Sequence, residues 1–296
     1  MKSSATTPIQ ELARPVEIVR KKHYGRYVTG AVLVVIAALL IRAFANADIG
    51  YGITAEYFTQ PFVIYGVLNT VILSVTAMAI GLVLGVLAAL ARLSANPVLK
   101  GVASTYIWLF RGTPVLVQLL LWYNMSLIFP TIYVPFLGEY TTNSIMTPFV
   151  AALIGLGVNE GAYMGEIIRG GILSVDNGQR QAAKALGMSP FQVTTRIVLP
   201  QAFRVCLPGT GNQFVIMLKS SSLASIVQYS ELLNKAETVY QRNLAIIELL
   251  LVASLWYIIL TTIFTFGQSL LERRAGRSQL TTARQRRFFR RNLAGA

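Results

Sequence analysis

Six long apolar segments constrain this chain more than any other feature of its sequence. A helix needs about 20 mainly apolar residues to cross a bilayer. Segments that meet this requirement lie at 28–46, 63–91, 113–130, 147–170, 205–225 and 246–271. The pattern predicts an all-α membrane protein with six transmembrane helices.

The composition supports a membrane protein and argues against soluble classes. Charged residues make up only 13% of the chain, whereas soluble domains contain roughly a quarter. A cytosolic enzyme, a disordered regulator and a fibrous protein are therefore excluded. The net charge of +14 does not indicate a nucleic-acid partner, because eight arginines are concentrated in the tail at 272–296. We expect anionic lipid headgroups to attract this tail.

Cysteine and histidine are too scarce for several kinds of site. The chain has one cysteine, Cys206, and one histidine, His23, so we predict no internal disulfide and no metal site. We interpret Cys206 as a small apolar residue at a helix start. There is also no GxxxxGK[ST] loop to hold nucleotide phosphates. We therefore expect no cofactor in this chain, and any ATP must bind another chain.

Lysine and arginine predict how the chain crosses the membrane. Basic connections remain cytoplasmic. The basic connections carry six Lys and Arg residues at 1–27, two at 92–100, four at 173–204 and eight in the tail. The alternating connections carry none at 47–62 and 131–146 and two at 226–245. Both termini are therefore predicted to be cytoplasmic.

The same reading divides the chain into regions. The apolar segment at 28–46 follows a long basic tail and lacks a convincing cleavage site, so we interpret it as a retained signal-anchor helix. The expected regions are a cytoplasmic tail at 1–27, an extra transmembrane helix at 28–46, a five-helix core at 63–271 with a cytoplasmic loop at 173–204, and a basic cytoplasmic tail at 272–296.

The cytoplasmic loop has the signals of two short helices. A strong helix former precedes Gly187, which favours a helix end, and Ser189 with Pro190 favours a new helix start. The pair Leu199–Pro200 is expected to end the second helix. Two helices with a glycine corner make an exposed docking element. An amphipathic hairpin that lies on the membrane is the alternative.

Four ordered motifs resemble the permease subunits of ATP-binding-cassette amino-acid importers, in the polar amino-acid permease family. One is similar to the family's EAA loop and includes Gln181, Ala182, Ala183, Gly187, Ile197, Leu199 and Pro200. The other motifs lie at 110–118, 162–172 and 219–223. Gln181 departs from the family, which usually has Glu there, so any ion pair made by that Glu is absent.

The resemblance covers about residues 65–271 and implies a transport subunit, not an enzyme. It implies a multi-pass protein in the cytoplasmic (inner) membrane of a prokaryote that moves an amino acid. The implied partners are ATPase subunits docked on the loop at 179–200, a second permease copy or a paralogue, and an extracytoplasmic solute-binding protein. A same-family permease for an opine or an organic cation is the alternative. An ion-coupled secondary transporter is less favoured, because no internal repeat is found.

A short polar motif precedes the third apolar segment. Gly112, Thr113 and Pro114 are typical of a helix N-terminus, with Thr113 as the cap and Pro114 in the first turn. Arg111 lies just before them. The motif is either a gate or bend on the transport path, or a helix start beside a snorkelling arginine.

The segment at 147–170 predicts close helix packing and one ion pair. Gly157, Gly161 and Gly165 recur every four residues and form a small-residue stripe that allows helix backbones to approach closely. Glu166 and Arg169 are three residues apart on nearly the same face, so we predict a structural ion pair between them.

Polar residues inside the apolar segments are the candidates for the substrate path. An intramembrane carboxylate is costly unless it meets a cavity or a partner. Glu160 has no basic residue one helical turn away, so we expect it to contact a substrate's ammonium group or cationic side chain. Lys219 either attracts a substrate carboxylate or snorkels outward. The remaining candidates that line the path are Asn69, Gln118, Asn159 and Asn212.

Overall fold

The computed structural model describes residues 24–134 and 138–293, with side chains described as far as residue 274. The chain forms two compact units, which divide between Ile49 and Gly50. The described part of the first unit is helix α1 (Tyr24–Asn46), which includes the predicted extra transmembrane segment. Most of the predicted N-terminal tail lies outside the described residues.

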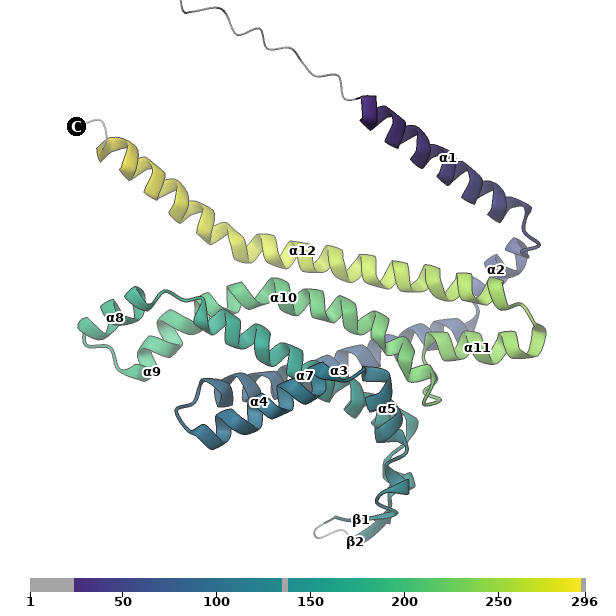
Figure 1. Cartoon of the computed structure of the whole chain (residues 1–296), viewed down its shortest axis with the longest axis horizontal. Coiled ribbons are helices and arrows are strands. Elements are labelled where there is room, and N and C mark those ends of the chain that lie inside the picture. Colours follow the sequence, from purple (N-terminus) through teal and green to yellow (C-terminus); the bar gives the residue numbers. More distant parts are fainter. Residues whose placement is uncertain (1–23, 135–137, 294–296) are drawn as a thin grey trace, which may run out of the picture. The chain divides into compact units, whose positions relative to one another are not determined.

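The second unit is a set of helices with one small hairpin (Figure 1). Its elements are α2 (Tyr51–Phe58), α3 (Pro61–Leu93), α4 (Pro97–Gly112), α5 (Val115–Tyr123), η2 (Met125–Leu127), β1 (Thr131–Val134), β2 (Gly138–Thr141), α6 (Thr142–Ile145), α7 (Pro148–Leu173), α8 (Asn177–Ala185), α9 (Pro190–Gln192), η3 (Val193–Val198), α10 (Leu199–Ser220), η4 (Ser221–Ser225), α11 (Leu232–Asn243) and α12 (Ile246–Leu293). The strands pair antiparallel, with Thr131 opposite Thr141. The predicted helical class is therefore confirmed apart from this hairpin.

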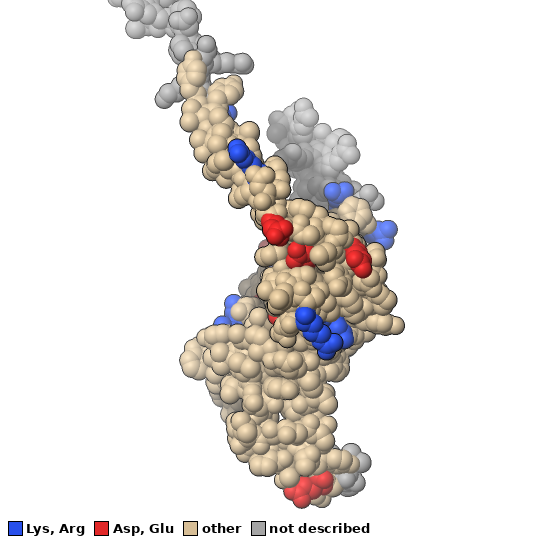
Figure 2. Space-filling view, turned by 90° about the vertical axis from the view of Figure 1, so that its right-hand side faces the viewer, with Lys and Arg blue, Asp and Glu red and all other residues tan. Residues whose placement is uncertain are grey.

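Three helices in the described part are long and apolar enough to cross a membrane by length and composition. These stretches are Tyr24–Asn46, Pro61–Leu93 and Ile246–Arg274. Helices α7 and α10 have 26 and 22 residues but carry more polar side chains. Figure 2 shows a largely uncharged face on which Lys, Arg, Asp and Glu gather in a few groups. The six-helix count and the orientation of the termini stay predictions.

The expectation of one continuous span at 113–130 is wrong. Helix α5 has only nine residues, which extend about 14 Å and cannot cross a hydrocarbon core of about 30 Å. The preceding helix α4, which the sequence analysis did not identify, ends at Gly112. The break has a local cause, because Pro114 disfavours a helical conformation at Thr113, whose φ and ψ are −115° and 146°.

Helices α3 and α7 form the centre of the second unit. The predicted glycine stripe lies against α3: a Cβ at Gly157 would lie 3.0 Å from a side-chain atom of Ile80, and one at Gly165 would lie 3.1 Å from the Ala88 Cβ. Helix α3 contributes glycines of its own, because a Cβ at Gly81 would lie 2.7 Å from the Glu160 Cγ. The expected close helix pair is therefore present, and it fixes the side of α7 that carries Glu160.

Helix α10 begins earlier and runs more continuously than expected. Leu199 and Pro200 do not end the loop's second helix; instead, the π-helical turn η3 leads directly into α10. Pro200 is the second residue of α10 and directly follows the π-helical turn. Pro208 also lies inside this helix.

Candidate functional site

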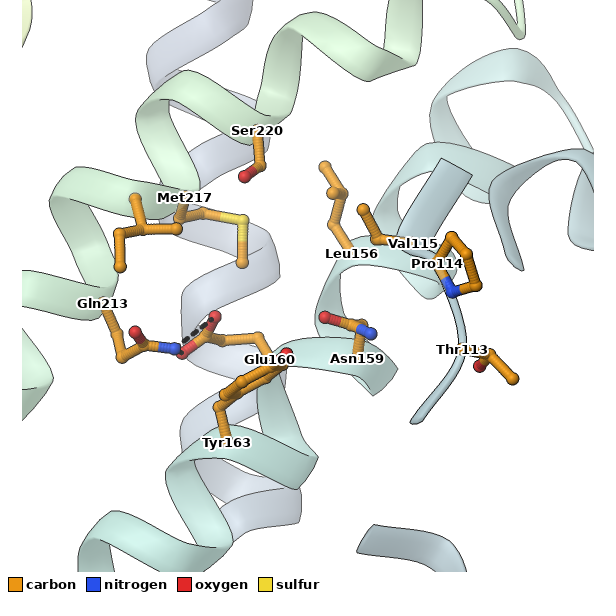
Figure 3. A pocket seen from close by; sticks show the side chains of 11 residues that line it. Thr113, Pro114, Val115, Leu156, Asn159, Glu160, Tyr163, Gln213, Met217 and Ser220 are labelled. Carbon is orange, nitrogen blue, oxygen red and sulfur yellow. Dashed lines mark hydrogen bonds between the residues drawn. The ribbon is translucent and has the colours of Figure 1, made fainter. Parts of the chain in front are cut away.

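A cavity of ≈ 360 Å³ lies between the start of α5, helix α7 and helix α10 (Figure 3). We call it the Glu160 cavity. Its lining residues are Thr113, Pro114, Val115, Leu156, Asn159, Glu160, Tyr163, Gln213, Ile216, Met217 and Ser220. The α4–α5 break forms one wall, and the turns of α7 and α10 with polar side chains form the others. The cavity is therefore lined by a mixture of polar and apolar side chains.

Glu160 is the only acidic residue that lines this cavity, and it is 4% exposed. The Gln213 side-chain amide donates to its two carboxylate oxygens, with N···O distances of 3.2 and 3.4 Å (Figure 3). Among the described residues, the ion pairs formed by acidic side chains involve Glu166 and not Glu160. A buried carboxylate with one neutral partner leaves negative charge that a cation in the cavity would offset.

Two amides support the cavity wall at the helix break. The Gln118 Nε2 donates to Thr113 Oγ1 at 2.7 Å and to Phe110 O at 3.1 Å. The Asn159 Nδ2 donates to the same Phe110 carbonyl at 2.7 Å and to Gln118 Oε1 at 3.1 Å. These bonds satisfy backbone carbonyls that the break leaves without helical partners. Asn159 lines the cavity, whereas Gln118 supports its wall and does not line it.

The prediction that Thr113 caps the following helix is wrong. Helix α5 begins at Val115 with Pro114 in the cap position, and no side chain bonds to its first N–H groups. The Thr113 hydroxyl instead donates back to Leu109 O at 2.8 Å. The reason is that the Gln118 side chain holds Thr113 at the end of α4, so the hydroxyl completes the preceding helix.

Arg111 lies next to an aromatic side chain of the cavity. Its guanidinium carbon is 5.1 Å from the ring centroid of Tyr163, within the range of a cation–π contact. Tyr163 lines the cavity and comes from the turn of α7 that follows Glu160. The arginine therefore covers one face of a ring whose edge reaches the Glu160 cavity.

Four of the six predicted path residues do not line the cavity, and Gln118, which supports its wall, is one of them. Asn69 donates to the Ser230 carbonyl at 2.8 Å and so ties α3 to the segment before α11. Asn212 and Lys219 are exposed side chains on α10. The structure brings Glu160 and Asn159 together in the cavity, with Gln118 behind Asn159.

The predicted pair at the end of α7 forms in the structure. Arg169 Nη2 lies 2.8 Å from Glu166 Oε2, and Arg92 of α3 adds a longer contact of 3.8 Å to the same carboxylate. This group lies outside the lining of the Glu160 cavity. Because Arg92 comes from α3 and Glu166 from α7, the group links these two helices.

The loop at 173–204 folds as two short helices around a glycine corner. Gly187 has φ of +78°, a conformation that strongly favours glycine. Ser189 then starts α9 with a capping box that includes Gln192. Ala183 is buried against the loop's own apolar cluster, whereas Gln181, Ala182, Leu199 and Pro200 are exposed and Ile197 is half-buried. The loop therefore has a small core of its own and an exposed outer surface.

Three polar residues of the cavity were not predicted from the sequence. Gln213, Tyr163 and Ser220 line the Glu160 cavity although none had been assigned to the substrate path. The sequence did indicate Gln213 as a candidate, because it is a polar residue in an otherwise apolar span. Its distance of 53 residues from Glu160 in the chain hid the contact.

Sequence reasoning also missed a second buried carboxylate. Glu231, which is fully buried, accepts a hydrogen bond of 2.6 Å from the Tyr257 hydroxyl and one of 2.8 Å from the Asn234 N–H. The Thr70 hydroxyl donates at 3.4 Å. We call these four residues the Glu231 cluster. Burial raises the pKa of Glu231, which lies outside the six predicted spans, to about 7.

Comparisons with known proteins give a consistent result. Residues 81–277 match the family described as binding-protein-dependent transport system inner membrane component. The arginine transport system permease protein ArgU of Corynebacterium glutamicum is 38% identical over 92% of this chain and 87% of its own length. The glutamine transport system permease protein GlnP of Escherichia coli is 34% identical over 72% of this chain and 93% of its own.

A solved structure supports the same assignment. The crystal structure of an amino acid ABC transporter with histidines is 36% identical and has a TM-score of 0.64, over 72% of this chain and 94% of that chain. The family match covers more than half of the sequence, and the similarity to ArgU extends over 92% of the chain. The chain therefore belongs to the family of binding-protein-dependent transport system inner membrane components.

Proposed function

We propose that this chain is the translocation subunit of an ATP-driven importer that moves an amino acid across the cytoplasmic membrane. The observation that carries the proposal is Glu160, a buried carboxylate beside a cavity, with one neutral partner. Every amino acid brings an ammonium group, and a basic amino acid brings a second cation. Either would offset the buried charge. The arginine and glutamine permeases among the relatives support this substrate class.

The carboxylate of an amino-acid substrate needs hydrogen-bond donors in the cavity, away from the group that meets Glu160. Ser220 and Asn159 line the cavity and carry a hydroxyl and an amide. Lys219 is exposed and lies outside the lining. The Asn159 amide already donates to Phe110 and Gln118, so we assign the carboxylate to the Ser220 hydroxyl in this conformation. Path roles for Asn69, Asn212 and Lys219 stay predictions. An opine is a second candidate substrate, because the nopaline permease of Agrobacterium fabrum is 38% identical over 68% of this chain.

The test of substrate binding removes the charge and keeps the shape. Glu160→Gln in the assembled transporter in vesicles should lower amino-acid uptake at least tenfold, while ATPase activity without substrate stays near the parent value. Glu56→Gln is the matched control, because Glu56 is exposed on α2 and lies away from the cavity lining. Unchanged uptake and affinity in Glu160→Gln would contradict the proposal.

We assign ATPase docking to the loop at 179–200. Leu186 and Phe191 flank the glycine corner and are 84% and 76% exposed, which is costly for large apolar side chains unless a partner covers them. ATP binding in the partner would displace this loop and shift the helices between inward-open and outward-open states. Gln181, Ala182, Ala183, Gly187, Ile197, Leu199 and Pro200 form the proposed coupling element.

The coupling proposal has its own test. Gly187→Val places a β-branched residue at φ of +78°, a conformation that such residues strongly avoid. Transport should fall at least tenfold while the protein still inserts into the membrane, and ATP hydrolysis should lose its link to substrate. Gly178→Ala is the control, because Gly178 lies at the start of α8 without a positive φ. Normal transport in Gly187→Val would overturn the docking assignment.

Three further parts of the proposal follow from the family. A second permease, identical or a paralogue, completes the membrane pair, and an extracytoplasmic solute-binding protein delivers the substrate. Arg111, Gly112, Thr113 and Pro114 form a gate at the cavity: the α4–α5 break can bend, and Arg111 can leave the Tyr163 ring when a substrate passes. An ion-coupled secondary transporter has no support from the family to which the chain belongs.

A further inference from the structure

An apolar groove of ≈ 650 Å³ lies between α3, α10 and α12. It shares no lining residue with the Glu160 cavity. On α10 the groove uses Leu207 and Phe214, whereas the cavity uses Gln213 and Ser220. The two hollows therefore occupy different faces of the same helix, and the groove takes no part in the proposed substrate path.

The shape of the groove suits a flexible apolar chain. The rings of Phe214 and Phe264 pack with centroids 4.9 Å apart and belong to its lining. At Gly267 nothing lies within 4 Å of the position that a Cβ would take, so the groove is open there. Ile263 and Leu271 are 59% and 56% exposed along the same helix. An unbranched hydrocarbon chain would cover this surface at little steric cost.

The groove ends at positive charge. Arg274 belongs to the lining, and its neighbour Arg273 is also exposed. Glu272 is the acidic residue beside them, and its carboxylate accepts a hydrogen bond of 2.7 Å from Gln268. The predicted span ends at residue 271, so both arginines lie where the headgroups of the cytoplasmic leaflet begin. That leaflet is rich in anionic lipids.

We propose that this groove is a binding site for an anionic phospholipid. An acyl chain lies over Phe214, Phe264 and Gly267, and the headgroup phosphate meets Arg273 and Arg274. A second copy of the chain is a poorer occupant, because membrane proteins of one orientation pair about an axis along the membrane normal. Such a copy would bring its own two arginines to the same depth. The site extends the expected attraction of the basic tail and does not depend on the proposed transport function.

The test measures lipid binding to the purified full-length permease. Phosphatidylglycerol, phosphatidylcholine and glycerol phosphate are titrated separately, and bound lipid is counted by native mass spectrometry. Phosphatidylglycerol should bind at least tenfold more tightly than phosphatidylcholine, and glycerol phosphate should not bind. The double variant Arg273→Gln, Arg274→Gln should remove the preference. Gly267→Leu fills the groove and should weaken phosphatidylglycerol binding about tenfold.

Two matched controls separate the groove from general effects. Gly101→Leu adds the same side chain at another open helical glycine on α4, and Arg242→Gln removes an exposed arginine from α11. Both should bind phosphatidylglycerol like the parent. Equal binding of the two lipids, or parental binding by Gly267→Leu, would overturn the proposal. Loss of permease pairing in Gly267→Leu with lipid binding intact would assign the groove to a second copy instead.

Discussion

Glu160 and Glu231 are both buried carboxylates, but their surroundings differ in a way that separates function from structure. Glu160 has one neutral donor, Gln213, and borders a cavity. Glu231 meets donors from Thr70, Asn234 and Tyr257 and lines none of the cavities described above. A buried carboxyl group with its hydrogen bonds complete stabilises one arrangement of helices. A buried charge left incomplete beside a cavity is available to a ligand.

The largest expected effect is on stability at Glu231. Glu231→Ala would leave the Tyr257 hydroxyl, the Thr70 hydroxyl and the Asn234 N–H without their partner, at about 1–3 kcal/mol for each group. We expect the melting temperature in detergent to fall by roughly 10 °C or more. Glu160→Ala should change it by less than about 3 °C, because only the Gln213 amide loses a partner. An equal fall of the melting temperature in Glu231→Ala and Glu160→Ala would contradict the proposed difference between the two carboxylates.

The next effect concerns pH. The pKa of Glu231 rises from 4.5 to about 7 because burial penalises the charged form. Folding therefore favours the protonated carboxyl. The raised pKa of Glu231 contributes on the order of 3 kcal/mol to the stability of the folded state. This contribution is complete below the ordinary pKa of 4.5 and is lost as the pH rises through about 7. Melting temperature measured from pH 5 to pH 8.5 should fall more steeply in the parent than in Glu231→Gln. Parallel curves would contradict this assignment.

A smaller effect is expected at Tyr257. Tyr257→Phe removes the hydroxyl that donates to Glu231 at 2.6 Å and keeps the ring. Loss of one hydrogen bond to a carboxyl group should cost about 1.5–3 kcal/mol, and uptake at a permissive temperature should remain near the parent value. The control is Tyr240→Phe on α11, whose ring packs against the neighbouring apolar cluster. A loss of substrate affinity in Tyr257→Phe would mean that the Glu231 cluster takes part in transport.

The smallest effect is expected at Gln213. Gln213→Met keeps the length of the side chain and removes the donor to Glu160. Stability should change little, whereas affinity for a cationic amino acid should increase by a few-fold, because the carboxylate then depends on the substrate alone. Direct binding measurements on the assembled transporter test this. Weaker binding would show that Gln213 positions the carboxylate for the substrate.

Local and periodic signals in the sequence predicted much of the structure. The stripe at Gly157, Gly161 and Gly165 indicated a close helix pair, and Ser189 with Pro190 indicated the start of α9. The pair Glu166 and Arg169 needed only the spacing of one helical turn. Each of these features depends on residues that are near neighbours in the chain.

Long-range contacts explain what the sequence did not reveal. The Glu231 cluster joins Thr70 to a residue 161 positions later, and no local pattern announces it. The α4–α5 break is held by Asn159, which lies 49 residues after the Phe110 carbonyl that it contacts. Lys219 is exposed on α10, and its sequence context alone left both an inward and an outward orientation open.

The π-helical turn joins the loop at 173–204 to α10 with no residue outside a helical conformation. Residues 190–220 therefore form one uninterrupted helical segment, of which α10 alone is roughly 33 Å long at 1.5 Å per residue. One end carries the exposed Phe191, and the other carries Ser220 on the wall of the Glu160 cavity. A tilt of about 5° around one end of α10 moves its other end by about 3 Å. A helix of this length acts as a lever, so a small displacement of the loop at 173–204 is enough to change the width of the Glu160 cavity.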